Sequence, residues 1–502
     1  MWNVIWNWGA FSFSLVIGFF LSPFVIHHLG DAGYGVWVLM LSVTSYLGFF
    51  DLGVRGAVTR YVSKFHTQGD HQEASRIASS ATGIFLIAGA LAILVALVLA
   101  LVAVDLFQIP PAYHQPARSV LLLSGITMAV TLIGGVFGGI LVGLQRFDLS
   151  NTIGVLSTGL RALATVLVLR AGRGIVALAW IQLIFSVVPV IASAYLSLRL
   201  YPQLRISMRH FAWAPVSLIF SFSVVSFLCN VSQQVIYYTD AVVIGIFLPV
   251  GLITFFSIAG NLMNYARALI SGISFTMTPL ASSLEAAGKN QRLQQVALDA
   301  PRYATALMLP IAATFIVRGQ SFIRLWMGPE YAELSGRVLW ILSLALLFSA
   351  ATQVLASVMF GISRHRVMMV AVLVEAVCNL AASVALVRVI GIVGVAWATT
   401  IPNLAASLLF WPWYVRRTLG IPIRSYLLSI WVRPGLAVLP FVLCTYMVDR
   451  FWTAASLVTF CLQVVAVLPF AAVGLWLICF TRSERQACAR NLFQPLMQVL
   501  GG

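Results

Sequence analysis

Apolar stretches of about 20 residues, long enough to cross a hydrocarbon layer about 30 Å thick as helices, recur along the whole sequence. Backbone groups have no water partners in such a layer, so a helix, which pairs them within one segment, is favoured. A closed barrel would need alternating strands of about ten residues, whereas runs such as 83–104 are continuously apolar. The sequence therefore predicts an all-α polytopic membrane protein.

Composition leaves no room for a sizeable soluble domain. Charged residues make up 9% of the chain and hydrophobic residues 61%, whereas soluble domains are about 25% charged. The net charge of +16 suits loops that face an anionic membrane leaflet, and we expect no nucleic-acid partner. The six cysteines have no metal-ligand spacing, and we expect no metal and no other cofactor.

Fourteen membrane spans can be placed along the chain, the first of them in place of a signal peptide, because no basic region precedes it. They are 4–28, 34–57, 81–104, 119–144, 151–170, 174–198, 216–248, 251–276, 302–324, 337–361, 367–388, 391–415, 430–448 and 455–480. Of the 30 Lys and Arg residues, 20 then fall in loops on the side of the N-terminus and 8 on the opposite side. Basic residues accumulate in cytoplasmic loops, so both termini are predicted to be cytoplasmic.

The sequence repeats itself at an offset near 218 residues. Residues 170–180 (RAGRGIVALAW) resemble 388–397 (RVIGIVGVAW), and 143–146 (GLQR) resembles 361–364 (GISR). Six spans separate equivalent positions, so the halves are expected to be parallel repeats, which in transporters flank a substrate site. We predict an N-terminal half at 1–212, a C-terminal half at 213–417, and two additional helices with a cytoplasmic tail at 418–502.

Several short motifs resemble those of a known transporter family. They are LGDAGYG at 29–35, FDLG at 50–53, RYV at 60–62 and DAVVIGIFLPVG at 240–251. Together with the six-plus-six-plus-two layout, they resemble the polysaccharide transporter (Wzx-type oligosaccharide flippase) branch of the multidrug/oligosaccharidyl-lipid/polysaccharide exporter superfamily. The resemblance implies a flippase that carries undecaprenyl-pyrophosphate-linked oligosaccharide, such as an O-antigen or exopolysaccharide unit, to the periplasmic leaflet of the bacterial inner membrane.

Two arginines inside spans are candidates for binding the substrate. Arg161 lies near the middle of the fifth span and Arg267 in the cytoplasmic half of the eighth. An intramembrane Arg usually faces a cavity or a partner, and its guanidinium matches the oxygens of a pyrophosphate. The alternatives are a structural ion pair for Arg161 and extension of the Arg267 side chain to the interface.

The seventh span carries a polar stripe at helical spacing, which indicates a face turned away from lipid. Its members, candidates for a hydrated substrate cavity or for helix–helix hydrogen bonds, are Ser223, Ser226, Asn230, Gln233, Gln234 and Tyr237.

Two intramembrane carboxylates are candidates for ion coupling. Asp240 lies in the seventh span and Glu375 in the eleventh. Either could bind H⁺ or Na⁺, since burial raises a carboxylate pKa toward neutrality, or could pair with an intramembrane arginine. Asp51 and Arg55, one turn apart in the second span, are predicted to form a local ion pair, with a gate as the second possibility.

Other functions remain open at this stage. A cation or drug antiporter of the same superfamily is the nearest alternative, and a lipid II flippase is another. A membrane-bound glycan polymerase or glycosyltransferase would need catalytic residues in a sizeable outer loop, and the outer loops are short, so we predict that the chain is not an enzyme. No GxxxxGK[ST] loop is present, so ATP hydrolysis is not expected. The expected partners are the lipid-linked oligosaccharide, membrane lipids, H⁺ or Na⁺, and the polymerase or ligase machinery.

Overall fold

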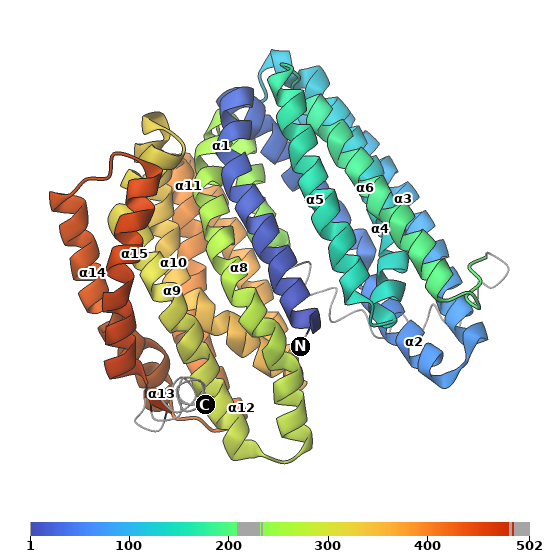
Figure 1. Ribbon diagram of the computed structural model, residues 1–502. Helices are drawn as coiled ribbons and strands as arrows, with labels where there is room; N and C mark the ends of the chain where they lie inside the picture. The colour runs from blue at the N-terminus through green and yellow to red at the C-terminus, as the bar shows by residue number, and fades with distance from the viewer. Residues whose placement is uncertain (1, 208–230, 232–233, 481–483, 486–502) are drawn as a thin grey trace, which may run out of the picture. The chain divides into compact units, whose positions relative to one another are not determined.

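The computed structural model describes residues 2–207, 231, 234–480 and 484–485. Every regular element within these ranges is a helix, and the described residues contain no strand (Figure 1). Ten of the described helical stretches are long and apolar enough to cross a membrane. The predicted class, an all-α multi-pass membrane protein, is confirmed.

The chain divides into two compact units, of which unit 1 comprises Met1–Ser257 and Val372–Val395 and unit 2 comprises Ile258–Ala371 and Ala396–Gly502. The elements of unit 1 are α1 (Trp2–Ser45), η1 (Tyr46–Asp51), α2 (Val54–Gln68), α3 (His71–Leu106), η2 (Pro111–Tyr113), α4 (His114–Gly143), α5 (Phe147–Arg170), α6 (Ile175–Leu200) and the helix Gln234–Phe247. Two helices run through both units, α8 (Gly251–Ala286) and α11 (Arg366–Ala405).

The remaining elements belong to unit 2, where α14 and α15 pack together and against α9 (Figure 1). They are α9 (Asn290–Trp326), α10 (Pro329–Gly361), η4 (Ala406–Phe410), α12 (Trp411–Leu419), α13 (Ile423–Leu427), η5 (Leu428–Val432), α14 (Arg433–Phe451), α15 (Leu457–Gly474) and η6 (Leu475–Cys479). The division into compact units does not test the domain limits at 212 and 417, which stay predictions.

Two of the long helices contain a kink with non-helical backbone angles. The helix α1 is interrupted at Gly30, which has a φ of 67°, and α11 at Ile390 and Gly391. The total of fourteen spans and the six-plus-six-plus-two layout stay predictions.

Local geometry recurs at the offset of the sequence repeat. Residues with a positive φ occur in three pairs that are 218 or 219 residues apart. The pairs are Gly69 and Gly288, Gln145 and Ser363, and Gly172 and Gly391. Since Gln145 and Ser363 are not glycines, their shared positive φ (61° and 54°) is uncommon. This coincidence supports the predicted repeat.

Small residues let α3 and α4 approach closely while large ones remain exposed. On α3, Ala92 and Ala96 are buried, whereas Leu94 and Leu101 are exposed. Gly125 on α4 packs against Ala96 with no space for a Cβ atom. Close backbone approach through small residues is the usual packing mode in membranes, where apolar side chains gain nothing by leaving lipid.

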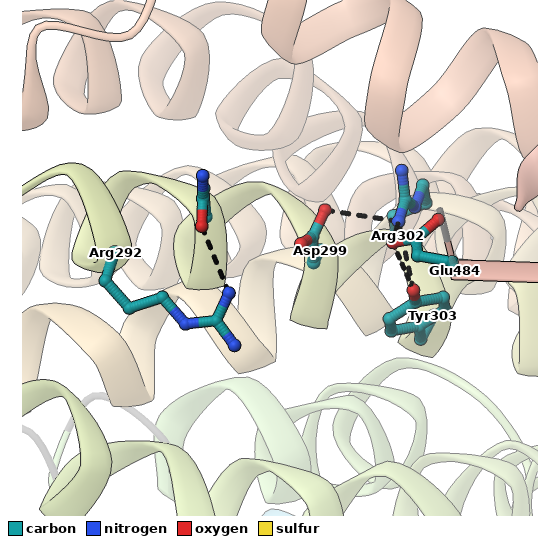
Figure 2. Close-up of polar contacts among 6 residues, drawn as sticks. Arg292, Asp299, Arg302, Tyr303 and Glu484 are labelled. Carbon is teal, nitrogen blue, oxygen red and sulfur yellow. Dashed lines mark hydrogen bonds and ion pairs between the residues drawn. The ribbon is translucent and has the colours of Figure 1, made fainter. Parts of the chain in front are cut away.

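In unit 2, a cluster of polar contacts joins the N-terminal half of α9 to Glu484, which follows η6 (Figure 2). The side chain of Arg302 is 3% exposed and pairs with Asp299 Oδ1 at 3.1 Å and with Glu484. Tyr303 also donates its hydroxyl to Glu484 Oε1 at 2.6 Å. Two carboxylates therefore balance one buried guanidinium.

A second buried arginine lies sixteen residues further along α9. The Arg318 side chain is 1% exposed; its Nε lies 3.1 Å from Asp449 Oδ1 of α14, and its Nη2 donates to Gln463 Oε1 of α15 at 2.5 Å. The guanidinium also lies 4.3 Å from the centre of the Phe460 ring. These contacts attach both C-terminal helices to α9.

Candidate functional site

The second span is interrupted beside a cavity. The turn η1 ends at Asp51, and α2 begins at Val54. Between them, Leu52 and Gly53 are both left-handed, with φ of 49° and 76°. A left-handed leucine is strained, and such strain concentrates at functional sites. The interruption also leaves backbone groups without helical partners, which membrane proteins tolerate beside polar cavities.

The predicted ion pair between Asp51 and Arg55 is wrong. Asp51 Oδ1 accepts the backbone N–H of Arg55 at a long 3.4 Å, and no ion pair joins the two side chains. The carboxylate therefore caps the first turn of α2, where the positive end of the helix dipole favours an anion. The guanidinium is left for other contacts.

Cavity A, a volume of about 380 Å³ in unit 1, lies at this interruption. It brings together four of the residues predicted from the sequence: Asp51, Arg55, Gln234 and Tyr237. The side-chain oxygen Oε1 of Gln234 is buried without a hydrogen-bond partner in the described part of the chain. The rest of the lining is Gly48, Phe49, Leu52, Gly53, Met128, Thr131, Leu132 and Tyr238. Cavity A thus combines a cation and a carboxylate with amide and phenol groups.

Arg55 lies against bare backbone on α4. A Cβ atom at Gly135 would lie 3.0 Å from Arg55 Nε and 3.2 Å from Nη2, so the glycine makes space for the guanidinium. Arg55 is exposed, and its side chain makes no ion pair within the described residues. An unpaired guanidinium in a cavity is suited to binding a phosphate or a carboxylate of a ligand.

Cavity B, of about 260 Å³, adjoins cavity A, because Arg55 and Thr131 line both. Its other lining residues are Gly134, Gly135 and Gly138 of α4 and Ser186, Pro189, Val190 and Ser193 of α6. These residues were not predicted, because they are small and uncharged, whereas charged and amide side chains stand out within an apolar span. Their signal is the spacing of Thr131, Gly134, Gly135 and Gly138, which places small residues on one face of α4.

Arg161 lies on the side of α5 that is turned away from the exposed apolar face. The leucines at 156, 160, 163 and 167, which are 51–60% exposed, form one stripe along α5. At 3.6 residues per turn, Arg161 lies on the order of 130° around the helix from that stripe. Its side chain is exposed and has no hydrogen bond or ion pair to any described residue. This position favours a polar interior over a lipid-facing or paired arginine.

The two predicted carboxylates both belong to unit 1. Asp240 is 6% exposed, and its neighbour Thr239 lies with its Oγ1 2.8 Å from the Tyr46 hydroxyl. Glu375 is half-buried on α11, one turn before the buried Asn379. Neither carboxylate lines cavity A or B. Their predicted role in ion coupling is untested.

The remaining predicted residues lie elsewhere. Arg267 is half-buried on α8 in unit 2, where its carbonyl accepts the Ser271 hydroxyl at 3.4 Å. Asn230 and Gln233 lie outside the described residues. The described residues hold no group of three or more His, Cys, Asp or Glu side chains that could bind a metal ion.

Residues 29–336 match a family described as polysaccharide biosynthesis protein. An O-antigen transporter of Shigella flexneri is 20% identical over 416 residues, which cover 82% of this chain and 97% of the relative.

Two solved structures share the fold. The lipid II flippase MurJ, in an inward closed conformation, has a TM-score of 0.73 at 14% identity and covers 94% of this chain and 98% of its own. An inward-facing multidrug resistance MATE family transporter of the MOP superfamily has a TM-score of 0.69 at 17% identity. The match covers 81% of this chain and 94% of the transporter. The fold is therefore that of MATE and MurJ transporters. These relatives are transporters and flippases, which agrees with the prediction that the chain is not an enzyme.

Proposed function

Because the chain belongs to the polysaccharide biosynthesis protein family, we propose that it is a flippase that moves an undecaprenyl-pyrophosphate-linked oligosaccharide from the cytoplasmic to the periplasmic leaflet of the bacterial inner membrane. The observation that carries the proposal is the unpaired guanidinium of Arg55 in polar cavity A. The names of two relatives, an O-antigen transporter and a lipid II flippase, support the same class of cargo.

The proposed role of the cavity follows from the cost of moving a charged headgroup. An unpaired charge in hydrocarbon costs many kcal/mol, whereas Arg55 supplies a matched partner for phosphate oxygens. Gln234 and Tyr237 supply amide and phenol groups for the glycan. Asn230 and Gln233 are proposed as further substrate-binding residues on the basis of the sequence, and the lipid tail stays in the bilayer.

Arg161 and Arg267 are proposed as further phosphate contacts along the transport path. Alternating access between two parallel six-helix repeats, with two additional helices and both termini in the cytoplasm, would expose the site to each leaflet in turn. Asp51 and Arg55 would then also act as the gate, since the interrupted span lies between them. Delivery to a polymerase or ligase would remove the product.

A coupling ion is a separate proposal. The buried carboxylate of Asp240 and the half-buried one of Glu375 are candidates for binding H⁺ or Na⁺, because carboxylates inside spans are costly and commonly mark ion pathways. The same two residues support the second candidate function, a cation or drug antiporter.

The test is a flipping assay in liposomes. A fluorescent undecaprenyl-pyrophosphate-linked oligosaccharide is followed by its accessibility to a membrane-impermeant quencher. We expect the wild type to move the lipid and Arg55→Gln to be slower by about tenfold or more, because a hydrogen bond to a charged group contributes about 1.5–3 kcal/mol. Arg60→Gln is the matched control, since Arg60 is an exposed arginine of the same helix that lines neither cavity.

Two results would overturn the proposal. Wild-type protein that leaves the glycolipid in place but exchanges small cations for H⁺ or Na⁺ would be an antiporter. If Arg55→Gln and Arg60→Gln slow flipping equally, the cavity does not carry the substrate.

A further inference from the structure

Cavity B is turned away from the apolar surface of its own helices. Trp180, Ile184, Val188 and Ile191 form the exposed stripe of α6. Ser186 and Ser193 each lie two positions from a member of this stripe, which is about 200° around the helix. The cavity therefore lies on the side of α6 that is opposite to the exposed apolar stripe.

The lining of cavity B suits a neutral group of a ligand better than a second charged group. Arg55 is its single charged lining residue, and it lies at the wall shared with cavity A. Hydroxyls come from Thr131, Ser186 and Ser193, while Pro189 and Val190 provide apolar surface. Hydroxyl acceptors beside an apolar wall suit a sugar ring, which presents hydroxyls at its rim and C–H groups on its faces.

The hydroxyls have capacity for a ligand. Thr131 and Ser186 donate to the carbonyls of Thr127 and Leu183 at 2.8 and 2.7 Å, so their oxygens remain able to accept. The Ser193 hydroxyl makes no hydrogen bond to any residue that the structure describes. A bound hydroxyl group would therefore find both acceptors and a free donor.

The size of cavity B limits its occupant. A volume of about 260 Å³ is below the range of about 300–1,000 Å³ that is typical for drug-sized ligands. It holds one ring rather than an oligosaccharide, so the remainder of a glycan would have to extend out of it.

We propose that cavity B binds the sugar that is linked directly to the pyrophosphate, while Arg55, at the shared wall, binds the phosphate. This inference rests on the proposed flippase function and adds a subsite for the first sugar. The protein then recognises a glycosyl phosphate as one unit and tolerates variation in the outer sugars.

Two lipid probes test this subsite. Binding of undecaprenyl pyrophosphate and of undecaprenyl pyrophosphate carrying a single N-acetylglucosamine is measured on the full chain in nanodiscs. We expect the wild type to bind the sugar-bearing lipid about tenfold more tightly, as two or three added hydrogen bonds permit.

One variant fills the cavity without disturbing its walls. A Cβ atom at Gly138 would have no heavy atom within 4 Å, so Gly138→Val places its methyl groups in empty space. We expect this variant to lose the preference for the sugar-bearing lipid while it binds the bare lipid as before. The matched control is Gly435→Val in α14. A Cβ atom at Gly435 also has open space, and Gly435 lines none of the described cavities. Ser193→Ala, which removes one hydroxyl and adds no bulk, should weaken the preference severalfold.

The outcomes separate the two proposals. If the wild type binds neither lipid, the flippase function fails and the subsite with it. If it binds both lipids equally, or if Gly138→Val and Ser193→Ala both keep the full preference, the sugar subsite is overturned and the flippase function stands.

Discussion

Four arginines of the helices form two pairs of residues that differ in their partners. Arg302 and Arg318 are buried and paired with carboxylates. Arg55 and Arg161 are exposed and make no ion pair with the described residues. Removing one partner of a buried pair leaves an uncompensated charge and destabilises the fold. An exposed, unpaired arginine has no such structural role, so its presence within a span points to function.

Arg161 offers a direct test of this distinction. Arg161→Gln should leave thermal unfolding in detergent unchanged, because no contact within the described residues is lost, and should slow glycolipid flipping by about tenfold. Arg170→Gln, at the exposed end of the same helix, should change neither. A clear fall in the unfolding temperature of Arg161→Gln would instead identify a structural partner and remove the residue from the transport path.

At the scale of single elements, the strained interruption of the second span lies in the wall of cavity A. Two successive left-handed residues, Leu52 and Gly53, separate η1 from α2. Without the interruption, Asp51 would lie within a continuous helix and would not be free to cap α2. The strained turn therefore places Asp51 at the start of α2, beside cavity A.

Gly53→Ala tests whether the left-handed turn is required. A Cβ atom at a φ of 76° should cost about 1–2 kcal/mol of unfolding free energy. Gly56, three residues later in α2, is an instructive control, since it is helical and has no neighbour near its Cβ position. Gly56→Ala should therefore stabilise the protein by about 0.5–1 kcal/mol. Equal effects of the two substitutions on denaturant unfolding would contradict the strained turn.

The sequence predicted the elements better than it predicted their interruptions. Length and apolarity placed a span at 34–57, but a leucine in the left-handed region has no sequence signature, so the break at Leu52 was missed. The polar residues Asp51, Arg55, Gln234 and Tyr237 were found because intramembrane polarity is rare. Gly134 and Gly138 were missed because glycines that shape a cavity look the same in sequence as glycines that bring helices together.

At the scale of the whole chain, α9 is the element to which the C-terminal helices attach. Its two buried arginines are sixteen residues apart, which is about 24 Å along a helix. Arg302 holds Glu484 near one end, and Arg318 holds Asp449 and Gln463 near the other. Neither contact was predicted from the sequence. The partners are more than 100 residues apart, and no sequence motif links them.

We predict that the contacts of Arg318 with Asp449 and Gln463 stabilise the fold and have no part in transport. Asp449→Asn should lower the unfolding free energy by about 1.5–3 kcal/mol, since it removes an ionic partner of a buried guanidinium. The double variant Arg318→Leu/Asp449→Leu should recover much of that loss, because apolar residues can replace a buried ion pair at little cost. Glu333→Gln, which breaks the exposed pair with Arg337, should change the free energy by less than about 1 kcal/mol. If the double variant unfolds like wild type yet no longer flips glycolipid, these contacts contribute to transport, and the assignment of a purely structural role is wrong.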